Sequence, residues 1–162
     1  MKRTHTIPPI CAKDIAPQIK KSNYPEPYAS QMQGREKRKL GDHFGLTNFG
    51  VNLTELQSGA VSALFHKHTK QDEFVYVLSG TGQVRMGKKL FNISAGDVIG
   101  FKANSGTGHQ IINSGNELLV FIEVGDRTSN DRVDYPNDDL CASLNEDGHW
   151  FFTNKKGEPY AQ

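Results

Sequence analysis

The sequence predicts an all-β protein built around a single hydrophobic core. Its 162 residues, 36% of them hydrophobic, suffice for one compact domain but would divide poorly into two. Sixteen glycines and seven prolines interrupt the chain, and its apolar runs are only five to eight residues long. Short apolar runs between turn residues are typical of strands rather than of the long amphipathic helices of a bundle.

The first forty residues, 1–40, are predicted to form an irregular N-terminal arm. They carry nine Lys and Arg against three Asp and Glu, whereas the rest of the chain carries ten against fifteen. The basic run "GREKRKLG", 34–41, lacks the interleaved aromatic residues of a nucleic-acid surface, so we expect a solvated segment and no nucleic-acid partner. Proline, which fixes its own φ and cannot donate to a neighbouring strand, recurs in the arm at Pro8, Pro9, Pro17, Pro25 and Pro27.

Residues 41–126 are predicted to form a β-barrel. The period of two begins where Phe49, Val51 and Leu53 alternate with polar or small residues, which indicates a half-buried strand. Further strands are predicted at 60–66, 73–78, 82–86, 90–93, 97–101, 109–113 and 118–124. Turn residues lie between them at 79–82, 87–89, 94–97, 104–108 and 113–116. About one turn in every ten residues favours a sandwich, a jelly roll or a barrel.

Residues 127–162 are predicted to form a C-terminal extension that packs on the barrel. The stretch "DRTSNDRVDYPNDDL" is acidic and polar, and its Asp residues lack the spacing of a calcium loop, so we expect a solvated loop. The ending "HWFFTNKKGEPY" joins an apolar patch to a hairpin turn at "NKKG".

The sequence also favours a cytoplasmic location. The N-terminal residues lack the apolar stretch of a secretory signal, and no run is long enough to cross a membrane. Two distant cysteines, Cys11 and Cys141, are expected to stay reduced in that compartment.

A pair of histidines, His66 and His68, is the first candidate for chemistry. Residues i and i+2 of a strand share one face about 6.6 Å apart, so both imidazoles can reach one metal ion. Glu73 has the opposite parity and can join them only if "TKQD" forms a turn. His109, which follows the glycine-rich "NSGTG", is a candidate ligand from a distant strand. Three imidazoles and one carboxylate suit an octahedral divalent ion with two positions left for water or substrate.

Two segments that contain these residues resemble the two motifs of the cupin family. The first, 59–80, begins and ends with glycine and contains both histidines and the glutamate. The second, 96–113, contains His109. The resemblance covers about residues 45–125 and implies a double-stranded β-helix, or jelly roll. It also implies that His66, His68, Glu73 and His109 bind a divalent metal ion, whether Mn, Fe, Zn, Ni or Co.

Three details depart from the usual cupin motifs. The spacer after Gly59 is one residue longer, Lys102 stands where proline is usual, and the loop 104–108 is longer. These changes concern the mouth of the pocket more than the metal ligands. Lys102 and Arg85 are candidate contacts for a substrate anion, although such residues are more often solvated strand positions.

The segments after the barrel resemble a subgroup of bacterial single-domain cupins, of the cupin-2 type, some of which are labelled sugar-phosphate isomerases. The resemblance implies a metal-dependent isomerase or epimerase of a sugar or sugar phosphate. Glu73 is then the candidate catalytic base, if it can leave the metal. An iron-dependent dioxygenase and a non-catalytic binding protein for a carbohydrate or small acid remain alternatives. We also expect a homodimer, in which the arm covers an edge strand of its own chain or of the partner.

Overall fold

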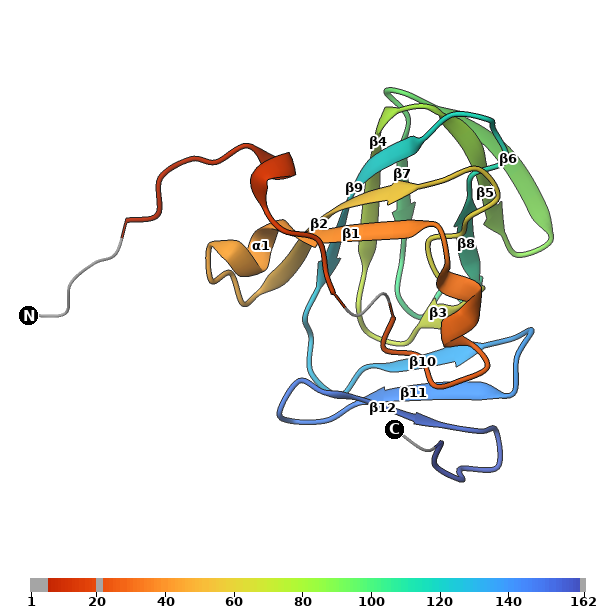
Figure 1. The fold of residues 1–162 in the computed structure, drawn as a ribbon. Coiled ribbons are helices and arrows are strands. Elements are labelled where there is room, and N and C mark those ends of the chain that lie inside the picture. The colour runs from red at the N-terminus through yellow and green to blue at the C-terminus, as the bar shows by residue number, and fades with distance from the viewer. Residues whose placement is uncertain (1–5, 20–21, 161–162) are drawn as a thin grey trace, which may run out of the picture.

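The computed structural model describes residues 6–19 and 22–160, and strands dominate both the barrel and the C-terminal extension (Figure 1). The one α-helix in these ranges, α1 (Leu40–His43), is a single turn. Two 3₁₀ turns, η1 (Ala12–Asp14) and η2 (Ala29–Met32), lie in the arm. The all-β prediction is confirmed. Among the described helices, none has both the length and the apolar character needed to span a bilayer.

Antiparallel strands form three sheets, with the orders β1-β2-β9-β4-β7, β6-β5-β8 and β12-β11-β10-β3. The strands are β1 (Arg35–Lys39), β2 (Phe49–Leu56), β3 (Lys67–His68), β4 (Glu73–Ser79), β5 (Thr81–Met86), β6 (Lys89–Ser94), β7 (Val98–Phe101), β8 (His109–Ile112), β9 (Leu119–Asp126), β10 (Arg132–Tyr135), β11 (Leu140–Leu144) and β12 (Trp150–Thr153).

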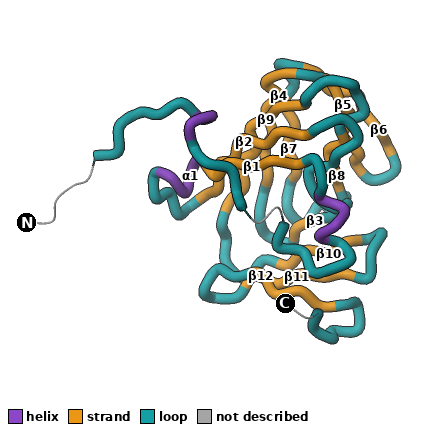
Figure 2. The backbone as a smooth tube through the Cα atoms, in the orientation of Figure 1, coloured by secondary structure: helices purple, strands orange, loops and turns teal. Residues whose placement is uncertain are grey.

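The main core lies between the sheets β1-β2-β9-β4-β7 and β6-β5-β8, which together form the jelly roll (Figure 2). Val77 and Phe121 from the first sheet pack with Val84 and Ile111 from the second. Burying each such side chain stabilises the fold by about 1.5–3 kcal/mol relative to leaving it exposed. The intervening residues of β4, Phe74 and Tyr76, point outward.

The segment 60–66, predicted as a strand, is instead an irregular stretch. It makes only isolated bridges, between Val61 and Ile112 and between His66 and His109. The hydroxyl of Ser62 accepts the hydrogen bond from the Ile111 N–H, where a regular ladder would use a backbone carbonyl. This part of the prediction is therefore wrong, and the regular strand, β3, begins only at Lys67.

The basic run of the arm forms β1, so the expectation of a solvated, irregular segment is wrong there. β1 pairs with β2 along its whole length and covers that edge within the same chain. Its cations alternate between faces: Lys37 pairs with Glu123 on the inner face, whereas Arg38 contacts Glu55 at 3.1 Å on the outer face. The divisions 1–40, 41–126 and 127–162 stay predictions.

The acidic stretch 126–140 was expected to be a solvated loop, but it contains β10 and ends on the first residue of β11. With β12 and β3 these strands form a layer across one end of the barrel (Figure 1). The predicted turn at "NKKG" is confirmed by a 3.0 Å hydrogen bond from Gly157 N–H to Asn154 O. A second core joins this layer to the arm, and its buried members are Tyr28, Met32, Leu64, Val133, Tyr135, Leu140 and Ala142.

Candidate metal centre

The four predicted ligands converge at the end of the barrel that faces the C-terminal layer. His66 and His68 each place Nε2 3.7 Å from Oε2 of Glu73, and His109 places Nε2 2.8 Å from the same oxygen. One ligand atom from each of His66, His68 and Glu73 lies within 4.8 Å of the other two. The rings of His66 and His109 are 4.4 Å apart. Three imidazoles and one carboxylate, from two distant segments, therefore surround one point.

The backbone brings these groups together by a turn and by a bridge. Asp131 accepts hydrogen bonds from the N–H groups of Thr69 and Lys70, at 3.0 and 2.7 Å, and so fixes the turn between β3 and β4. After that reversal Glu73 faces the histidines, as the sequence required. His66 and His109 exchange two backbone hydrogen bonds, of 3.1 and 2.8 Å, which hold the two motifs side by side.

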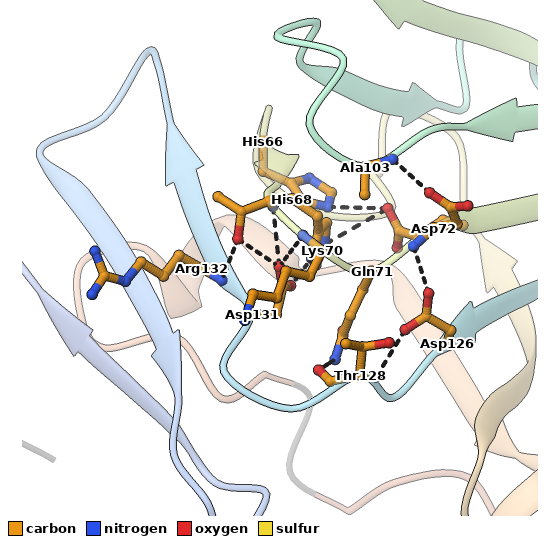
Figure 3. Close-up of polar contacts among 12 residues, drawn as sticks. His66, His68, Lys70, Gln71, Asp72, Ala103, Asp126, Thr128, Asp131 and Arg132 are labelled. Carbon is orange, nitrogen blue, oxygen red and sulfur yellow. Dashed lines mark hydrogen bonds and ion pairs between the residues drawn. The ribbon is translucent and has the colours of Figure 1, made fainter.

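Two of the imidazoles are oriented by partners on their far side. His66 Nδ1 lies 2.8 Å from Leu64 O, and since a carbonyl only accepts, Nδ1 carries the proton. His68 Nδ1 lies 2.5 Å from Oδ2 of Asp131, which is completely buried (Figure 3). In the neutral form of each ring, a proton on Nδ1 leaves the lone pair on Nε2, the nitrogen that faces the cluster and that a metal would bind.

Asp131 orients a ring of the candidate site, and the sequence analysis did not single it out. Burial would raise the pKa of its carboxyl, but the hydrogen bond from His68 and the N–H of Lys70 outweigh that effect and hold the pKa below its usual range. Asp131 therefore stays ionised and raises the pKa of His68 against the lowering effect of burial. The residues next to Asp131 in the sequence do not indicate this role, because the partners of Asp131 lie about sixty residues earlier in the chain.

The electrostatics of Glu73 fit a bound cation. Burial would raise the pKa of this carboxyl, but the imidazoles of His109 and His66 hold it well below its ordinary value. Burial also lowers the pKa of His109, which favours a neutral ring. Although His109 is close, Oε2 of Glu73 is buried and has no hydrogen-bond partner among the described residues. An ionised oxygen left without a donor is costly, and a divalent ion shared with three Nε2 lone pairs would satisfy it.

A cavity of about 1000 Å³ opens from the cluster. Its wall is built from the inner face of the five-stranded sheet, from the arm and from the C-terminal layer. The volume suits a small molecule. Several basic and aromatic residues of the wall were not singled out from the sequence: Tyr24, Arg35, Lys37, Arg127, Tyr135 and Trp150.

The two predicted anion contacts, Arg85 and Lys102, do not line this cavity. Arg85 alternates with the inward Val84 of β5, and its guanidinium lies 3.9 Å over the ring of Phe65. Its Nε donates to Gly87 O at 3.2 Å. Lys102 follows β7 and is exposed. The basic groups that do reach the cavity come from β1 and from the turn after β9.

Comparison with known proteins agrees with this geometry. A cupin domain model matches residues 52–125. A sugar phosphate isomerase of the cupin superfamily from Silicibacter pomeroyi is 35% identical, with a TM-score of 0.88 over 95% of this chain and 97% of that chain. A candidate sugar phosphate isomerase from Acidithiobacillus ferrooxidans is 34% identical, with a TM-score of 0.70 over 79% of this chain and 81% of that one.

A more distant likeness shows the fold alone: the polyketide cyclase RemF from Streptomyces resistomycificus is 17% identical, with a TM-score of 0.61 over 75% of this chain and 80% of its own. No curated protein matches the sequence. The chain belongs to the cupin superfamily. Within it, the chain groups with the cupin-2 type proteins that are named as sugar phosphate isomerases.

Proposed function

We propose that the protein is a metal-dependent isomerase or epimerase of a sugar or sugar phosphate. The observation that carries the proposal is the convergence of three Nε2 atoms on Oε2 of Glu73, at 2.8 to 3.7 Å, where a cavity of about 1000 Å³ meets them. Support comes also from two relatives whose names give the same reaction class. The small-molecule substrate is expected to occupy this cavity.

His66, His68, Glu73 and His109 are the residues that would hold the divalent ion, whether Mn, Fe, Zn, Ni or Co. Such an ion supplies Lewis-acid polarisation of a substrate carbonyl and its neighbouring hydroxyl. Buried carbonyl and carboxylate partners hold two of the imidazoles in place, so the ligand set is organised before any substrate enters.

The chain must also supply a base, and Glu73 is the proposed one. In an aldose–ketose isomerisation it would take the proton from C2 and return it to C1, while the O2 hydroxyl proton passes to O1. An epimerisation would need, besides Glu73, a second acid that returns a proton to the same carbon from the opposite face. For either role Glu73 must turn away from His109, which it contacts at 2.8 Å.

A reconstitution assay tests the proposed function. Protein stripped with a chelator would be reloaded separately with each of the five metals and mixed with aldose and ketose phosphates from trioses to hexoses. We expect interconversion, followed by NMR, with at least one metal and none with the stripped protein. Absence of turnover across the panel would contradict the proposal. Oxygen uptake by the iron-loaded protein with a catechol, thiol or diketone would replace it with a dioxygenase, and ligand-induced stabilisation without product would favour a binding protein.

We also propose that the protein is a homodimer and that it is cytoplasmic. Four apolar side chains on the outer face of β4 and β7 are 41–60% exposed, namely Phe74, Tyr76, Leu78 and Val98. A contiguous exposed apolar patch of this kind marks a protein–protein contact. Light scattering should give twice the mass of one chain. The double substitution Phe74→Glu and Tyr76→Glu should give a monomer, whereas Leu90→Glu on β6 should not. A wild-type monomer at micromolar concentration would contradict this proposal.

A further inference from the structure

We propose that Gly125 and Gly50 form the floor of a substrate channel that leads from the metal centre to Arg127, whose guanidinium binds the anionic end of the substrate. The inference rests on the proposed function for what happens at the metal end. It adds the path along which the substrate lies, the length of substrate that fits this path, and the group that recognises the phosphate of the substrate.

The two glycines extend a row that begins at Glu73. In the register of the sheet, Glu73 of β4 pairs with Gly125 of β9, and Gly125 pairs with Gly50 of β2. They lie on the inner face, because each has the parity of a core residue of its strand, Phe121 in β9 and Leu56 in β2. Both line the cavity. With neighbouring strands about 4.8 Å apart, the row spans about 10 Å.

The fold itself does not require glycine at either position. Neither residue has the positive φ that favours glycine. A Cβ at Gly125 would lie 3.7 Å from Glu73 Cγ, and one at Gly50 would lie 3.5 Å from Arg127 Nη2, both ordinary contacts. Glycine inside a strand is destabilising relative to alanine, and it often marks a place where a ligand approaches the backbone. Two such glycines side by side, facing a cavity, indicate a floor that must stay free of side chains.

Arg127 closes the far end of this floor. Its Nη2 and Nε lie 3.5 and 3.6 Å from the position where a Cβ of Gly50 would be. Nη1 donates to Leu46 O at 2.9 Å, and Nη2 pairs with Asp42. A guanidinium has five N–H donors, so these contacts fix the group and leave donors for a ligand. The side chain is 40% exposed, so an anion can reach it.

Two carboxylates beside the channel, Glu123 and Asp42, are already paired with cations. Glu123 pairs with Lys37 and accepts a 3.1 Å hydrogen bond from Asn52. Asp42 pairs with Arg127 and lies 3.7 Å from Lys39. The negative charge of these two carboxylates is therefore offset by neighbouring cations, which reduces their repulsion of an incoming phosphate. The guanidinium of Arg127 can donate two parallel hydrogen bonds, a geometry that suits phosphate.

The length of the floor selects the substrate class. An open-chain pentose or hexose phosphate, with C–C bonds of about 1.5 Å, can place its carbonyl near the metal ligands and its phosphate near Arg127. A triose phosphate is too short to do both. We therefore infer a preference for pentose or hexose phosphates over triose phosphates and over unphosphorylated sugars.

Binding measurements on glycine variants test the channel. The single tryptophan, Trp150, lines the cavity, so its fluorescence can report the binding of D-ribose 5-phosphate, D-glucose 6-phosphate, D-glyceraldehyde 3-phosphate and D-glucose to the metal-loaded protein. Gly125→Ala and Gly50→Ala should melt at or above the wild-type temperature but bind the longer phosphates about 10-fold or more weakly, because each methyl group narrows the floor. The matched control is Gly100→Ala on β7, where a Cβ meets open space on the outer face. Because that face is the proposed dimer contact, light scattering must first show that the mass of this variant is unchanged, and it should then bind as wild type.

Two further variants test the anion end. Arg127→Gln should weaken the binding of D-glucose 6-phosphate about 10-fold to 100-fold and change that of D-glucose less than about 2-fold. Asp42→Asn should tighten phosphate binding, because it removes a competing carboxylate. If Asp42→Asn instead weakens binding as Arg127→Gln does, Arg127 is only a structural partner of Asp42 and its proposed role is overturned.

The outcomes separate this inference from the proposed function. Glycine variants that bind like the wild type, or a wild-type protein that binds neither of the longer phosphates, would overturn the channel even if some sugar is isomerised. Binding that depends on both glycines and on Arg127, without any turnover, would sustain the channel and overturn the proposed isomerase.

Discussion

The two ends of the cavity differ in whether their polar side chains are held by buried or by exposed partners. At the metal end, buried imidazoles are held by buried partners, Leu64 O behind His66 and Asp131 behind His68. At the mouth, Asp42 pairs with cations whose side chains are 40–45% exposed. Solvent and salt screen the exposed pairs, whereas a buried group that loses its partner has no water to replace it. The histidine rings at the metal end are therefore held more strongly by their partners than the charged side chains at the mouth are by their ion pairs.

Removing a metal ligand should have the largest effect. His66→Ala or His109→Ala should weaken metal affinity more than about 100-fold, beyond what loss of an outer partner causes. Elemental analysis after dialysis measures the bound metal. His43→Ala is the matched control, since His43 is exposed on α1 and should leave the metal content unchanged. Wild-type metal content in both ligand variants would refute the assignment of the site.

Removing the buried carboxylate behind His68 should have the next largest effect. Asp131→Asn leaves a neutral acceptor at Nδ1 of His68 and should lower metal affinity about 10-fold to 100-fold. Isothermal titration with the bound metal measures the change. Asp134→Asn is the control, because Asp134 lies three residues on and makes only partly exposed ion pairs, with Lys67 and Lys155. Equal affinities for the two variants would show that Asp131 does not support the ligand.

The smallest effect is expected at the mouth. Lys39→Ala removes a 3.7 Å ion pair with Asp42 in which both side chains are well exposed. The free energy of unfolding should fall by less than about 0.5 kcal/mol, and less still at high salt. Urea unfolding at low and high ionic strength measures this change. A loss above about 2 kcal/mol would mean that the mouth is as rigidly built as the metal end.

The barrel was predictable where one face of a strand is buried and the other is solvated. In β4 the inward Val75 and Val77 alternate with the outward Phe74 and Tyr76, and this period of two is visible in the sequence. β1 was missed because all five of its residues are charged, so no apolar period exists. Its stability comes instead from pairing with β2 and from ion pairs with distant residues such as Glu55 and Glu123.

The strands of the C-terminal layer were hidden by their acidic neighbours. β10 does alternate, with Val133 and Tyr135 buried, but it is only four residues long and lies among aspartates. Its inward residues are covered by Met32 of the arm, from the far end of the sequence. A contact over that separation leaves no local pattern.

The candidate site was predictable to the extent that its residues lie in recognisable motifs. The sequence indicated His66, His68, Glu73 and His109, and the structure brings all four together. The basic wall and Asp131 were not predictable, because their places depend on how β1 and β10 pack against the barrel. Ion pairs and buried hydrogen bonds of that kind depend on the tertiary fold rather than on residue spacing.

Anomalous diffraction from a crystal of the metal-loaded protein tests the central claim most directly. The account predicts one strong peak per chain, within about 2.0–2.3 Å of Nε2 of His66, His68 and His109 and of an oxygen of Glu73. A peak elsewhere, or a fully loaded protein in which the ring of His109 stays out of the coordination sphere, would contradict it.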